Sequence, residues 1–509
     1  MTVDAPEKCP ECGSTELVET DDEVVCESCG LTLDADDPVS DDSDIHDEVE
    51  WTAFEQDESS DADDEPEWRQ SFREQREKRE QRREARERER ERQQAALDDA
   101  PTLPIAWTAP DRRLIGSLGD LAILYDEESL YGLDLQSGDD VWETSMPTLV
   151  DEWFQDDIER LSASFMDWRV RLGRESIYVR PSKDEILALS ADDGRLQWDR
   201  TTAFEHSGRS VLTDESLYVT NEYGALTALS LDDGNVEWTA DALIDDASWQ
   251  SWFPASPVVC GGLVVTATNS DDGLVAARDR DSGDLVWQFP MRETPSVLTA
   301  SGGDLFAGTV RGDAYAIDTD DGSQRWRHRL TEFGDREDPN EKTRPTESVL
   351  GIERAGSLVV VTGSGYYSSV VDADDGSQSF ELLAAGSDDR FGTLDATFHH
   401  PSTVATDGTT FTHSGSVIQR YQFDTAASVE EARDWTFEAT DTLRARPTLS
   451  TNEDYLLATD DSERVCLLES ESGDPVYTCE LDDTAKRFVP TPDRLLVDTR
   501  TTVYAVESR

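Results

Sequence analysis

The 509-residue chain is poor in lysine and in long apolar runs, and its charge is strongly one-sided. Its 45 Lys+Arg residues face 112 Asp+Glu, which gives a formal charge of −67. A chain this negative is repelled by nucleic acid phosphates and by anionic membranes, so neither general DNA binding nor a membrane partner is expected. No apolar run approaches the roughly 20 residues that a membrane-spanning helix needs.

Cysteine is also scarce, with seven residues in the whole chain, so a disulfide scaffold is excluded. The first residues, MTVDAPEKCPEC, lack the basic and apolar segments of a secretory signal. The sequence therefore predicts a cytoplasmic protein.

Lysine occurs at only five positions, and the remaining basic residues are arginine. The lysines are Lys8, Lys78, Lys183, Lys342 and Lys486. Together with aspartate clusters that recur to the end of the chain, this composition resembles that of cytosolic proteins from salt-accumulating haloarchaea. Molar salt shortens the Debye length to about 3 Å, so the repulsion among these charges would be screened. A single disordered acidic tail explains only part of the charge.

Shifts in composition divide the chain into four parts. Residues 1–34 hold four of the seven cysteines, and residues 35–66 are rich in Asp, Ser and Glu. The second part has too few apolar residues to offset the entropy of ordering, which predicts a disordered acidic linker. A charged Arg/Glu helix is expected over 67–99, and short β-branched and aromatic runs separated by Asp/Gly turns fill 102–509.

Two Cys-x-x-Cys pairs near the N-terminus are typical of a zinc site. Zn²⁺ takes four thiolates in a tetrahedron at about 2.3 Å, and each pair can supply two of them. Short strands are expected between the pairs, around Val18 and Val25. A redox dithiol would need a βαβ context, which is missing here. The sequence predicts one structural zinc ion with the ligands Cys9, Cys12, Cys26 and Cys29.

The stretch CPECGSTELVETDDEVVCESCGLTL, with all four cysteines and the glycines that follow each pair, resembles the zinc ribbon of TFIIB-type transcription initiation factors. In that family the ribbon docks on RNA polymerase. The helical repeats with which those factors contact DNA are missing here, so transcriptional function is not carried over. From Met1 to Asp34, Lys8 is the only basic residue, against ten acidic ones, which makes a poor nucleic acid surface. A protein-docking ribbon and a purely structural zinc cap both stay open.

The largest feature is a repeat in which an Asp/Ser-Gly turn is followed, four residues after the glycine, by an aromatic residue. Glycine accepts the positive φ of such a turn, and the aromatic ring can then be buried against the neighbouring unit. With two apolar strands upstream, each unit has about four strands in roughly 40–57 residues, which is typical of propeller blades. The pairs are Gly138/Trp142, Gly194/Trp198, Gly234/Trp238, Gly283/Trp287, Gly322/Trp326, Gly376/Phe380 and Gly473/Tyr477.

This pattern resembles that of the PQQ-like (quinoprotein) β-propeller repeat family, over about residues 104–509. The resemblance implies an all-β fold. The C-terminal unit lacks an aromatic strand, and residues 104–109 (PIAWTA) supply a candidate for it, so that pairing of the two ends would close the ring. The repeat aromatics are then Trp107, Trp142, Trp198, Trp238, Trp287, Trp326, Phe380, Trp435 and Tyr477.

The number of blades follows less directly. Counting aromatic strands gives nine units, whereas this family commonly has eight. The unit around 392–437 is divergent, with an insertion before Trp435, and so is the one least expected to form an independent blade. Eight blades are favoured, and nine stays open.

Enzymes of this family bind pyrroloquinoline quinone (PQQ) and Ca²⁺ and share a vicinal cysteine pair and a catalytic Asp-x-Asp. This chain has no adjacent cysteines, and Asp279-Arg-Asp281 and Asp318-Thr-Asp320 lie in Asp-Gly turns that explain them. No catalytic residue is predicted, PQQ is not expected, and an enzyme is disfavoured. Other family members, such as an outer-membrane assembly lipoprotein, bind proteins.

Trp68 to Leu97 contains no Gly or Pro and is rich in strong helix formers. Glu-Arg pairs at i,i+4 each add about 0.2–0.5 kcal/mol. Almost no apolar stripe follows Phe72, so a coiled coil is not supported. A solvated single helix that separates the ribbon from the propeller is expected. Two alternatives are a basic element, with eleven basic and seven acidic residues from Arg69 to Arg92, that binds RNA or an acidic partner, and a helix folded back onto the acidic propeller.

Some remaining residues are weaker candidates. His399, His400 and His413 could together hold a metal, although packing histidines are commoner. Cys260 is most simply a buried small apolar residue.

Cys466 and Cys479 lie on either side of the Ser472-Gly473 turn, so a hairpin could place them opposite each other. A disulfide there is disfavoured in a reducing cytosol, and a bulge would break the pairing.

These features favour a non-catalytic cytoplasmic interaction scaffold, with the propeller and the ribbon as two docking modules for protein partners. The alternatives are an oxidoreductase dependent on PQQ or another small ligand, and a transcription- or RNA-linked regulator that uses the ribbon and the helix to contact RNA polymerase or RNA. The sequence does not identify a partner.

Overall fold

The computed structural model divides the chain into two compact units, Met1–Arg82 and Arg83–Arg509. Within the described part, no helix is long and apolar enough to cross a bilayer. The structure describes three strands between residues 17 and 34, and then residues 67–507 apart from 127, 147–168, 182–184, 202–208, 222, 246–254, 269, 302, 331–347, 364–366, 384–401, 407–408, 415, 424–425, 427, 441–442, 444 and 461–462.

The first unit contains a small antiparallel sheet in the order β1-β2-β3. Its strands are β1 (Leu17–Glu19), β2 (Glu23–Cys26) and β3 (Thr32–Asp34), and Val18 pairs with Val25. The first two are the strands expected between the cysteine pairs, and the third follows the second pair. The helix α1 (Glu67–Asp99) covers the residues for which the sequence predicts one, and it runs from the first unit into the second.

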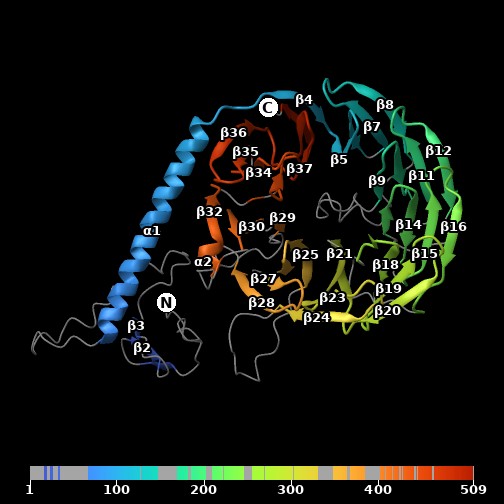
Figure 1. The fold of residues 1–509 in the computed structure, drawn as a ribbon. Coiled ribbons are helices and arrows are strands. Elements are labelled where there is room, and N and C mark those ends of the chain that lie inside the picture. The colour runs from blue at the N-terminus through green and yellow to red at the C-terminus, as the bar shows by residue number, and fades with distance from the viewer. Residues whose placement is uncertain are drawn as a thin grey trace, which may run out of the picture. The chain divides into compact units, whose positions relative to one another are not determined.

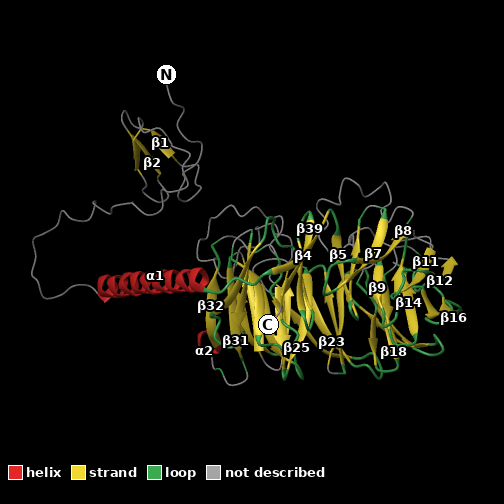
Figure 2. Cartoon of the chain, turned by 90° about the horizontal axis from the view of Figure 1, so that it is seen from above, coloured by secondary structure: helices red, strands yellow, loops and turns green. Residues whose placement is uncertain are grey.

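The second unit is a ring of four-stranded antiparallel sheets, in which the first strand of each sheet lies near the centre and the fourth lies outside (Figure 1). The strands run between the two faces of the ring (Figure 2). We number the blades from the one that joins the two ends of this unit. Blades 1 to 3 consist of β37 (Arg487–Pro490), β38 (Arg494–Asp498), β39 (Thr502–Glu507) and β4 (Ile105–Pro110); β5 (Arg113–Leu118), β6 (Leu121–Tyr125), β7 (Ser129–Asp134) and β8 (Asp140–Ser145); and β9 (Val170–Leu172), β10 (Ser176–Val179), β11 (Glu185–Ser190) and β12 (Leu196–Thr201).

The other blades repeat this plan. Blades 4 to 6 are β13 (Ser210–Leu212), β14 (Ser216–Thr220), β15 (Leu226–Ser230) and β16 (Val236–Ala240); β17 (Val258–Cys260), β18 (Leu263–Ala267), β19 (Leu274–Asp279) and β20 (Leu285–Pro290); and β21 (Pro295–Ser301), β22 (Asp304–Thr309), β23 (Asp313–Ile317) and β24 (Gln324–Arg329). Blades 7 to 9 are β25 (Val349–Ala355), β26 (Leu358–Gly363), β27 (Tyr367–Asp372) and β28 (Gln378–Leu383); β29 (Ser402–Thr406), β30 (Thr409–Ser414), β31 (Val417–Gln422) and β32 (Arg433–Glu438); and β33 (Thr448–Leu449), β34 (Tyr455–Thr459), β35 (Arg464–Glu469) and β36 (Pro475–Glu480).

The described residues thus form a nine-bladed propeller, which confirms the all-β propeller and corrects the preference for eight blades. The doubtful unit around 392–437 does form a separate sheet, blade 8. Its turn before the outer strand lacks the Asp-Gly pattern and holds the short helix α2 (Val429–Ala432), capped by the Ser428 side chain, which accepts a bond from the Glu431 amide at 3.2 Å. The insertion therefore lengthens one turn of the blade without replacing any of its strands.

The ring closes where the sequence predicts, by pairing of β4 with the C-terminal strand β39. Ala505 lies opposite Trp107, and Val503 lies opposite Ala109. The chain that leads into β4 also pairs along β36 of blade 9, because the Leu103 amide donates to the Thr478 carbonyl at 2.7 Å. Blade 1 therefore takes strands from both ends of the unit.

A tryptophan on each of seven outer strands ties its blade to the next one. Each indole N–H donates to a backbone carbonyl in the following blade at 2.8–3.2 Å. The indole also lies under the turn glycine of that blade, whose φ is between +67° and +76°. The contacts are Trp107 with Leu135 and Gly138, Trp142 with Ala191 and Gly194, Trp198 with Leu231 and Gly234, Trp238 with Arg280 and Gly283, Trp287 with Thr319 and Gly322, Trp326 with Ala373 and Gly376, and Trp435 with Ser470 and Gly473.

Two contacts between blades depart from this rule. Between blades 7 and 8, Phe380 packs against Phe423, Ala426 and Val429 of the lengthened turn. Between blades 9 and 1 this contact cannot form, because no turn joins the third and fourth strands of blade 1. These strands, β39 and β4, come from opposite ends of the unit. There the outer strand carries Tyr477, and the paired segment before β4 covers the strand.

This arrangement predicts that Gly322→Ala destabilises the ring more than Gly119→Ala does. Both glycines have positive φ, +73° and +58°, so either alanine is strained by about 1–2 kcal/mol. Only at Gly322 would the new Cβ lie 2.6 Å from the Trp287 ring, which adds roughly 1–3 kcal/mol for the displaced indole. Chemical unfolding at constant high KCl measures both. Equal losses for the two variants would contradict the tight contact.

Candidate interaction surfaces

The last turns of α1 are packed against the outer strand of blade 8, in the same unit as the propeller. Leu97 is buried with Phe437 and Leu456. The Gln93 side chain donates from Nε2 to the Thr436 carbonyl at 2.6 Å and accepts from the Glu438 amide at 3.1 Å, so it pairs with the backbone of β32 as a neighbouring strand would. The part of α1 from Arg83 onward therefore fits one of the three interpretations of this helix, namely that it folds back onto the propeller.

Ionic contacts accompany this packing. Arg86 Nε lies 3.0 Å from a Glu438 carboxylate oxygen, and Arg92 Nη2 lies 3.4 Å from one of Asp474. The guanidinium of Arg464 reaches Asp98 near the end of the helix at 3.2 Å. The expectation of a solvated spacer therefore needs correction for this part, since Arg86 and Arg92 lie beside carboxylates of blades 8 and 9.

We expect Gln93→Ala to loosen this part of the helix, while the neighbouring Gln94→Ala leaves it in place. The first substitution removes two hydrogen bonds to β32, worth about 1–3 kcal/mol together. Gln94 bonds only within the helix, to Asp98 at 3.1 Å. Hydrogen exchange of residues 83–99 in the full-length chain measures the difference. Unchanged protection in Gln93→Ala, with Leu97 intact, would show that these bonds do not hold the helix.

A row of exposed apolar side chains follows the outer strands of five consecutive blades. Each lies one or two residues before the tryptophan of its strand, and each is between 38% and 56% exposed. We call the set the outer apolar row: Ile105, Val141, Leu196, Val236, Leu285 and Val286.

The positions that correspond to this row are polar in the next three blades. Gln324, Gln378 and Arg433 occupy the second place before the aromatic residue, and all three are exposed. The apolar character is thus confined to one side of the ring. Acidic side chains accompany it, since Glu143, Asp199 and others on the same strands are also exposed.

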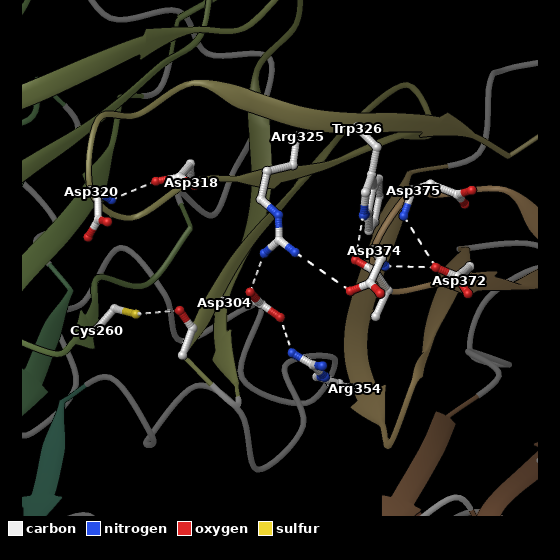
Figure 3. A network of polar contacts seen from close by, with 12 residues as sticks. Cys260, Asp304, Asp318, Asp320, Arg325, Trp326, Arg354, Asp372, Asp374 and Asp375 are labelled. Atoms are coloured by element: carbon white, nitrogen blue, oxygen red, sulfur yellow. Dashed lines mark hydrogen bonds and ion pairs between the residues drawn. The ribbon is translucent and has the colours of Figure 1, made fainter.

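On the polar side of the ring, an aspartate joins two blades (Figure 3). Asp304 of β22 accepts bonds from Arg325 in its own blade and from Arg354 on β25 of the next. Beside it, Cys260 Sγ lies 3.9 Å from the Gly303 carbonyl. Burial raises the pKa of the Cys260 thiol, as expected for the buried small residue that the sequence predicts at this position.

A fully buried carboxylate joins blades 1 and 2. Asp498, at the end of β38, accepts from Arg113 Nη2 of β5 at 3.0 Å and from the Leu114 amide at 3.1 Å. Burial raises the pKa of Asp498, and the bonds from Arg113 act in the opposite direction. Removing one partner of such a pair lowers the free energy of unfolding by about 3–5 kcal/mol. The contact therefore holds the C-terminal strands of blade 1 against blade 2.

The Asp-x-Asp strings are accounted for by their turns, as the sequence analysis expects. Asp279 accepts from the amides of Asp281 and Ser282 at 3.1 and 2.9 Å, and Asp318 accepts from the Asp320 amide at 2.9 Å. The Ser282 amide bond is the main cause of the lowered pKa of Asp279. The carboxylates of Asp279 and Asp318 thus bond to backbone amides of their own turns.

Cys466 and Cys479 do not form a disulfide. Cys466 lies opposite Thr478 and Cys479 opposite Val465, in a register that shifts at a bulge between Leu467 and Leu468. Adjacent register positions point to opposite faces of a sheet, and the two thiols are buried in different clusters. Neither is disulfide-bonded, and burial raises the pKa of Cys479 to about 11.

The predicted metal sites lie mainly outside the described residues. Of the zinc ligands only Cys26 falls within a described strand, β2, and Cys9, Cys12 and Cys29 do not. His413 lies on β30, whereas His399 and His400 are outside the described part.

The family model described as outer membrane protein assembly factor BamB matches residues 60–270 and 271–509. These segments span most of the sequence, so the chain belongs to this family. No curated protein matches the chain.

Several solved structures are similar to the chain at low identity. BamB from Moraxella catarrhalis is 14% identical, with a TM-score of 0.45, over 67% of this chain and 94% of that one. Sqt1 from Saccharomyces cerevisiae is 10% identical, with a TM-score of 0.45, over 66% and 93%. Quinohemoprotein alcohol dehydrogenase from Comamonas testosteroni is 12% identical, with a TM-score of 0.41, over 80% and 76%. Identities this low carry no information about activity.

Sequence reasoning missed two features. One is the identity of the residues that bring α1 onto blade 8, because Leu97 and Gln93 make this contact without any periodic pattern. The other is a group of arginines between blades 3 and 4. Its signal is present in the repeats, because Arg180 ends its strand at a place where blade 4 has Thr220 and blade 1 has Asp498.

Proposed function

We propose that this protein is a non-catalytic cytoplasmic interaction scaffold, and that the outer apolar row is the surface on which its propeller binds another protein. The observation that carries this proposal is the recurrence of exposed aliphatic side chains on five consecutive outer strands. Single exposed apolar residues need no explanation, but a row of them, rimmed by polar residues, is typical of an interaction surface. The family's description as an assembly factor supports the same role.

Two contacts within the chain support this proposal, because they add a segment of the chain to an outer strand. On blade 8, Gln93 bonds the backbone of β32 while Leu97 is buried beside it. On blade 9, the segment before β4 adds to β36 as a short parallel strand, with Thr102 bridged to Thr478. Blades 2 to 5 present the same kind of outermost strand, with aliphatic side chains on it.

The charge around the row indicates the chemistry of the partner. Glu143, Asp199 and Glu237 are exposed on β8, β12 and β16, next to the aliphatic residues. Complementary surfaces bring positive groups to such positions, which speeds encounter and excludes acidic competitors. The partner is therefore a protein surface that carries aliphatic and basic side chains.

A double substitution tests the surface. Leu196→Asp with Val236→Asp should remove the partner from full-length protein purified at native high salt, because it places two charges where aliphatic contacts form. Gln324→Asp with Gln378→Asp adds the same charge at matching positions on blades 6 and 7 and should leave binding unchanged. Quantitative mass spectrometry of co-purified proteins measures both. The proposed surface would be refuted if both variants lost the same proteins, or if both variants kept them.

The N-terminal ribbon is proposed as a second docking module that holds one zinc ion through Cys9, Cys12, Cys26 and Cys29. The antiparallel pairing of β1 with β2 supports it, because this hairpin connects the two Cys-x-x-Cys pairs. A zinc-centred ribbon can bind its own partner while the propeller binds another. The proposed role is then to hold two proteins together.

Metal analysis tests the ribbon independently of the propeller. Full-length protein should contain one zinc per chain, and Cys12→Ser with Cys29→Ser should lose it, because two of four thiolate ligands are removed. Cys466→Ser with Cys479→Ser changes as many cysteines and should keep the metal. Zinc content that is zero in the unaltered chain, or equal in both variants, would refute the site.

A further inference from the structure

The outer strands of blades 8 and 9 are bonded along their outward edges at the same position, the residue that follows the aromatic one. On blade 8 this residue is Thr436, whose carbonyl accepts from Gln93 Nε2 at 2.6 Å. On blade 9 it is Thr478, whose amide donates to the Pro101 carbonyl at 3.1 Å and whose carbonyl accepts from the Leu103 amide at 2.7 Å. The backbone groups of this threonine therefore point out of the sheet, where a further strand would pair.

The outer strand of blade 4, β16, has the same residue at this position without such a cover. Thr239 follows Trp238 and lies opposite Thr227 on β15, as Thr478 lies opposite Cys466 on β35. Because the register is the same, the amide and carbonyl of Thr239 also point away from β15. Among the described residues no strand pairs with the outer side of β16 (Figure 1), and Thr239 is exposed, whereas Thr478 is buried. The sheet of blade 4 therefore ends in an exposed edge.

The remaining outer strands carry features that oppose edge pairing, namely proline and charged residues. Pro110 on β4 and Pro290 on β20 stand three positions after the tryptophan, where they remove an outward amide. In blade 3 the Asp199 carbonyl already accepts from Arg200 Nη1 at 2.7 Å. The strands of blades 2, 3, 6 and 7 have a charged residue directly after the aromatic one: Glu143, Asp199, Arg327 and Glu381. Of the nine outer strands that the structure describes, only β16 has neither a cover nor one of these two features.

Exposed aliphatic side chains flank this edge on both faces. Val236 lies opposite Leu229, which is buried in the contact with blade 3, so Val236 is on the face turned toward blade 3. Leu285 of blade 5 lies opposite Arg278, whose Nη2 donates to the Asp241 carbonyl directly after β16, so Leu285 is on the face turned toward blade 4. Both belong to the outer apolar row. A strand added to β16 would therefore have an aliphatic neighbour on each face, because its side chains alternate between the two.

The charge of this edge indicates which strand it can receive. Glu237, Asp241 and Asp284 are exposed on or directly beside β16 and β20. Like charges across paired strands are unfavourable and opposite charges are favourable, so the edge disfavours a second copy of β16 and favours a strand with basic side chains. Aliphatic side chains, β-branched ones in particular, suit the pleated surface between the blades.

We propose that the partner of the propeller binds through an extended segment that adds to β16 as a fifth strand of blade 4 and carries aliphatic and basic side chains. This inference rests on the proposed function, because residues of the outer apolar row flank the added strand. The segment bonds the amide and carbonyl of Thr239 as residues 101 and 103 bond those of Thr478. In such strand addition the backbone bonds supply affinity, and the contacts of alternate side chains supply specificity.

The test titrates a fluorescent peptide against the full-length protein at constant high KCl and follows its anisotropy. The probe is Arg-Val-Ile-Arg-Val-Ile-Arg, which places arginine and aliphatic side chains on both faces of a strand. The comparison peptide, Arg-Val-Pro-Arg-Val-Pro-Arg, has the same charge but lacks two amides. We expect saturable binding of the first peptide and at least about tenfold weaker binding of the second, because proline cannot donate to the edge. Hydrogen exchange of residues 236–241 should slow when the first peptide binds.

Three variants locate the edge. Asp241→Pro gives blade 4 the proline that blades 1 and 5 carry at this position, so it should stay folded and bind the first peptide at least about tenfold more weakly. Asp241→Ser removes the charge but keeps the amide, so it should bind several-fold more tightly than Asp241→Pro. Ser145→Pro makes the corresponding change on blade 2 and should bind as the unaltered chain does. Thermal unfolding checks that all three are folded.

Two results would overturn the proposal, namely no saturable binding of the first peptide by the unaltered chain, or equal affinities in Asp241→Pro and Ser145→Pro. A dimer in sedimentation that Asp241→Pro dissociates would also overturn it, because the occupant would then be a second copy.

The double variant Leu196→Asp with Val236→Asp separates this proposal from the proposed function. If it loses the co-purified partner while Asp241→Pro keeps it, the outer apolar row is the surface and strand addition is wrong. If both variants keep the partner, the proposed function fails as well.

Discussion

The contact on which the propeller depends is the one between a tryptophan and the turn of the next blade. The indole needs two things at once, a carbonyl to accept its N–H and space for the ring under the turn. A residue in the left-handed region with no Cβ provides that space, so glycine and tryptophan are required together although they belong to neighbouring blades. Because the contact is the same from blade to blade, it fixes the spacing of the strands and the regularity of the ring.

Seven of the nine contacts between blades follow this rule, so the contacts that differ from it are informative. At blades 7 and 8 a lengthened turn with α2 replaces the glycine, and an aromatic cluster around Phe380 fills the gap. Between blades 9 and 1, where no glycine turn covers the outer strand, the segment before β4 pairs along β36, and β4 then completes blade 1.

Much of this architecture could be predicted from the sequence, because the repeat is local. The distance from Gly138 to Trp142 is four residues wherever the motif recurs, and the turn it encodes is the turn observed. The closing strand could also be predicted, since Trp107 stands alone before the first complete unit. The preference for eight blades was wrong because the insertion before Trp435 made its unit look unlike an independent blade, whereas all four strands of that unit are present.

The candidate sites were harder to predict because they depend on register and on distant residues. That Arg180 lies opposite Arg169 is set by the register of the strand pair, which joins residues eleven positions apart and is not visible as a motif. The contact of α1 rests on Leu97 and Gln93, two residues in a helix whose other side chains are mostly charged. The acidic composition, by contrast, was visible at once, and part of it consists of aspartates that cap turns, such as Asp279, and of carboxylates that border the outer apolar row, such as Asp199.

Ring closure is the claim that the account depends on most, and hydrogen exchange of the full-length chain at constant high KCl tests it directly. The account predicts that amides of β4, such as those of Trp107 and Ala109, exchange as slowly as those of the outer strands inside the ring, for example β12 and β20. Fast exchange of β4 together with slow exchange of those strands would show that the N-terminal strand is not part of blade 1. The closed nine-bladed ring would then be contradicted.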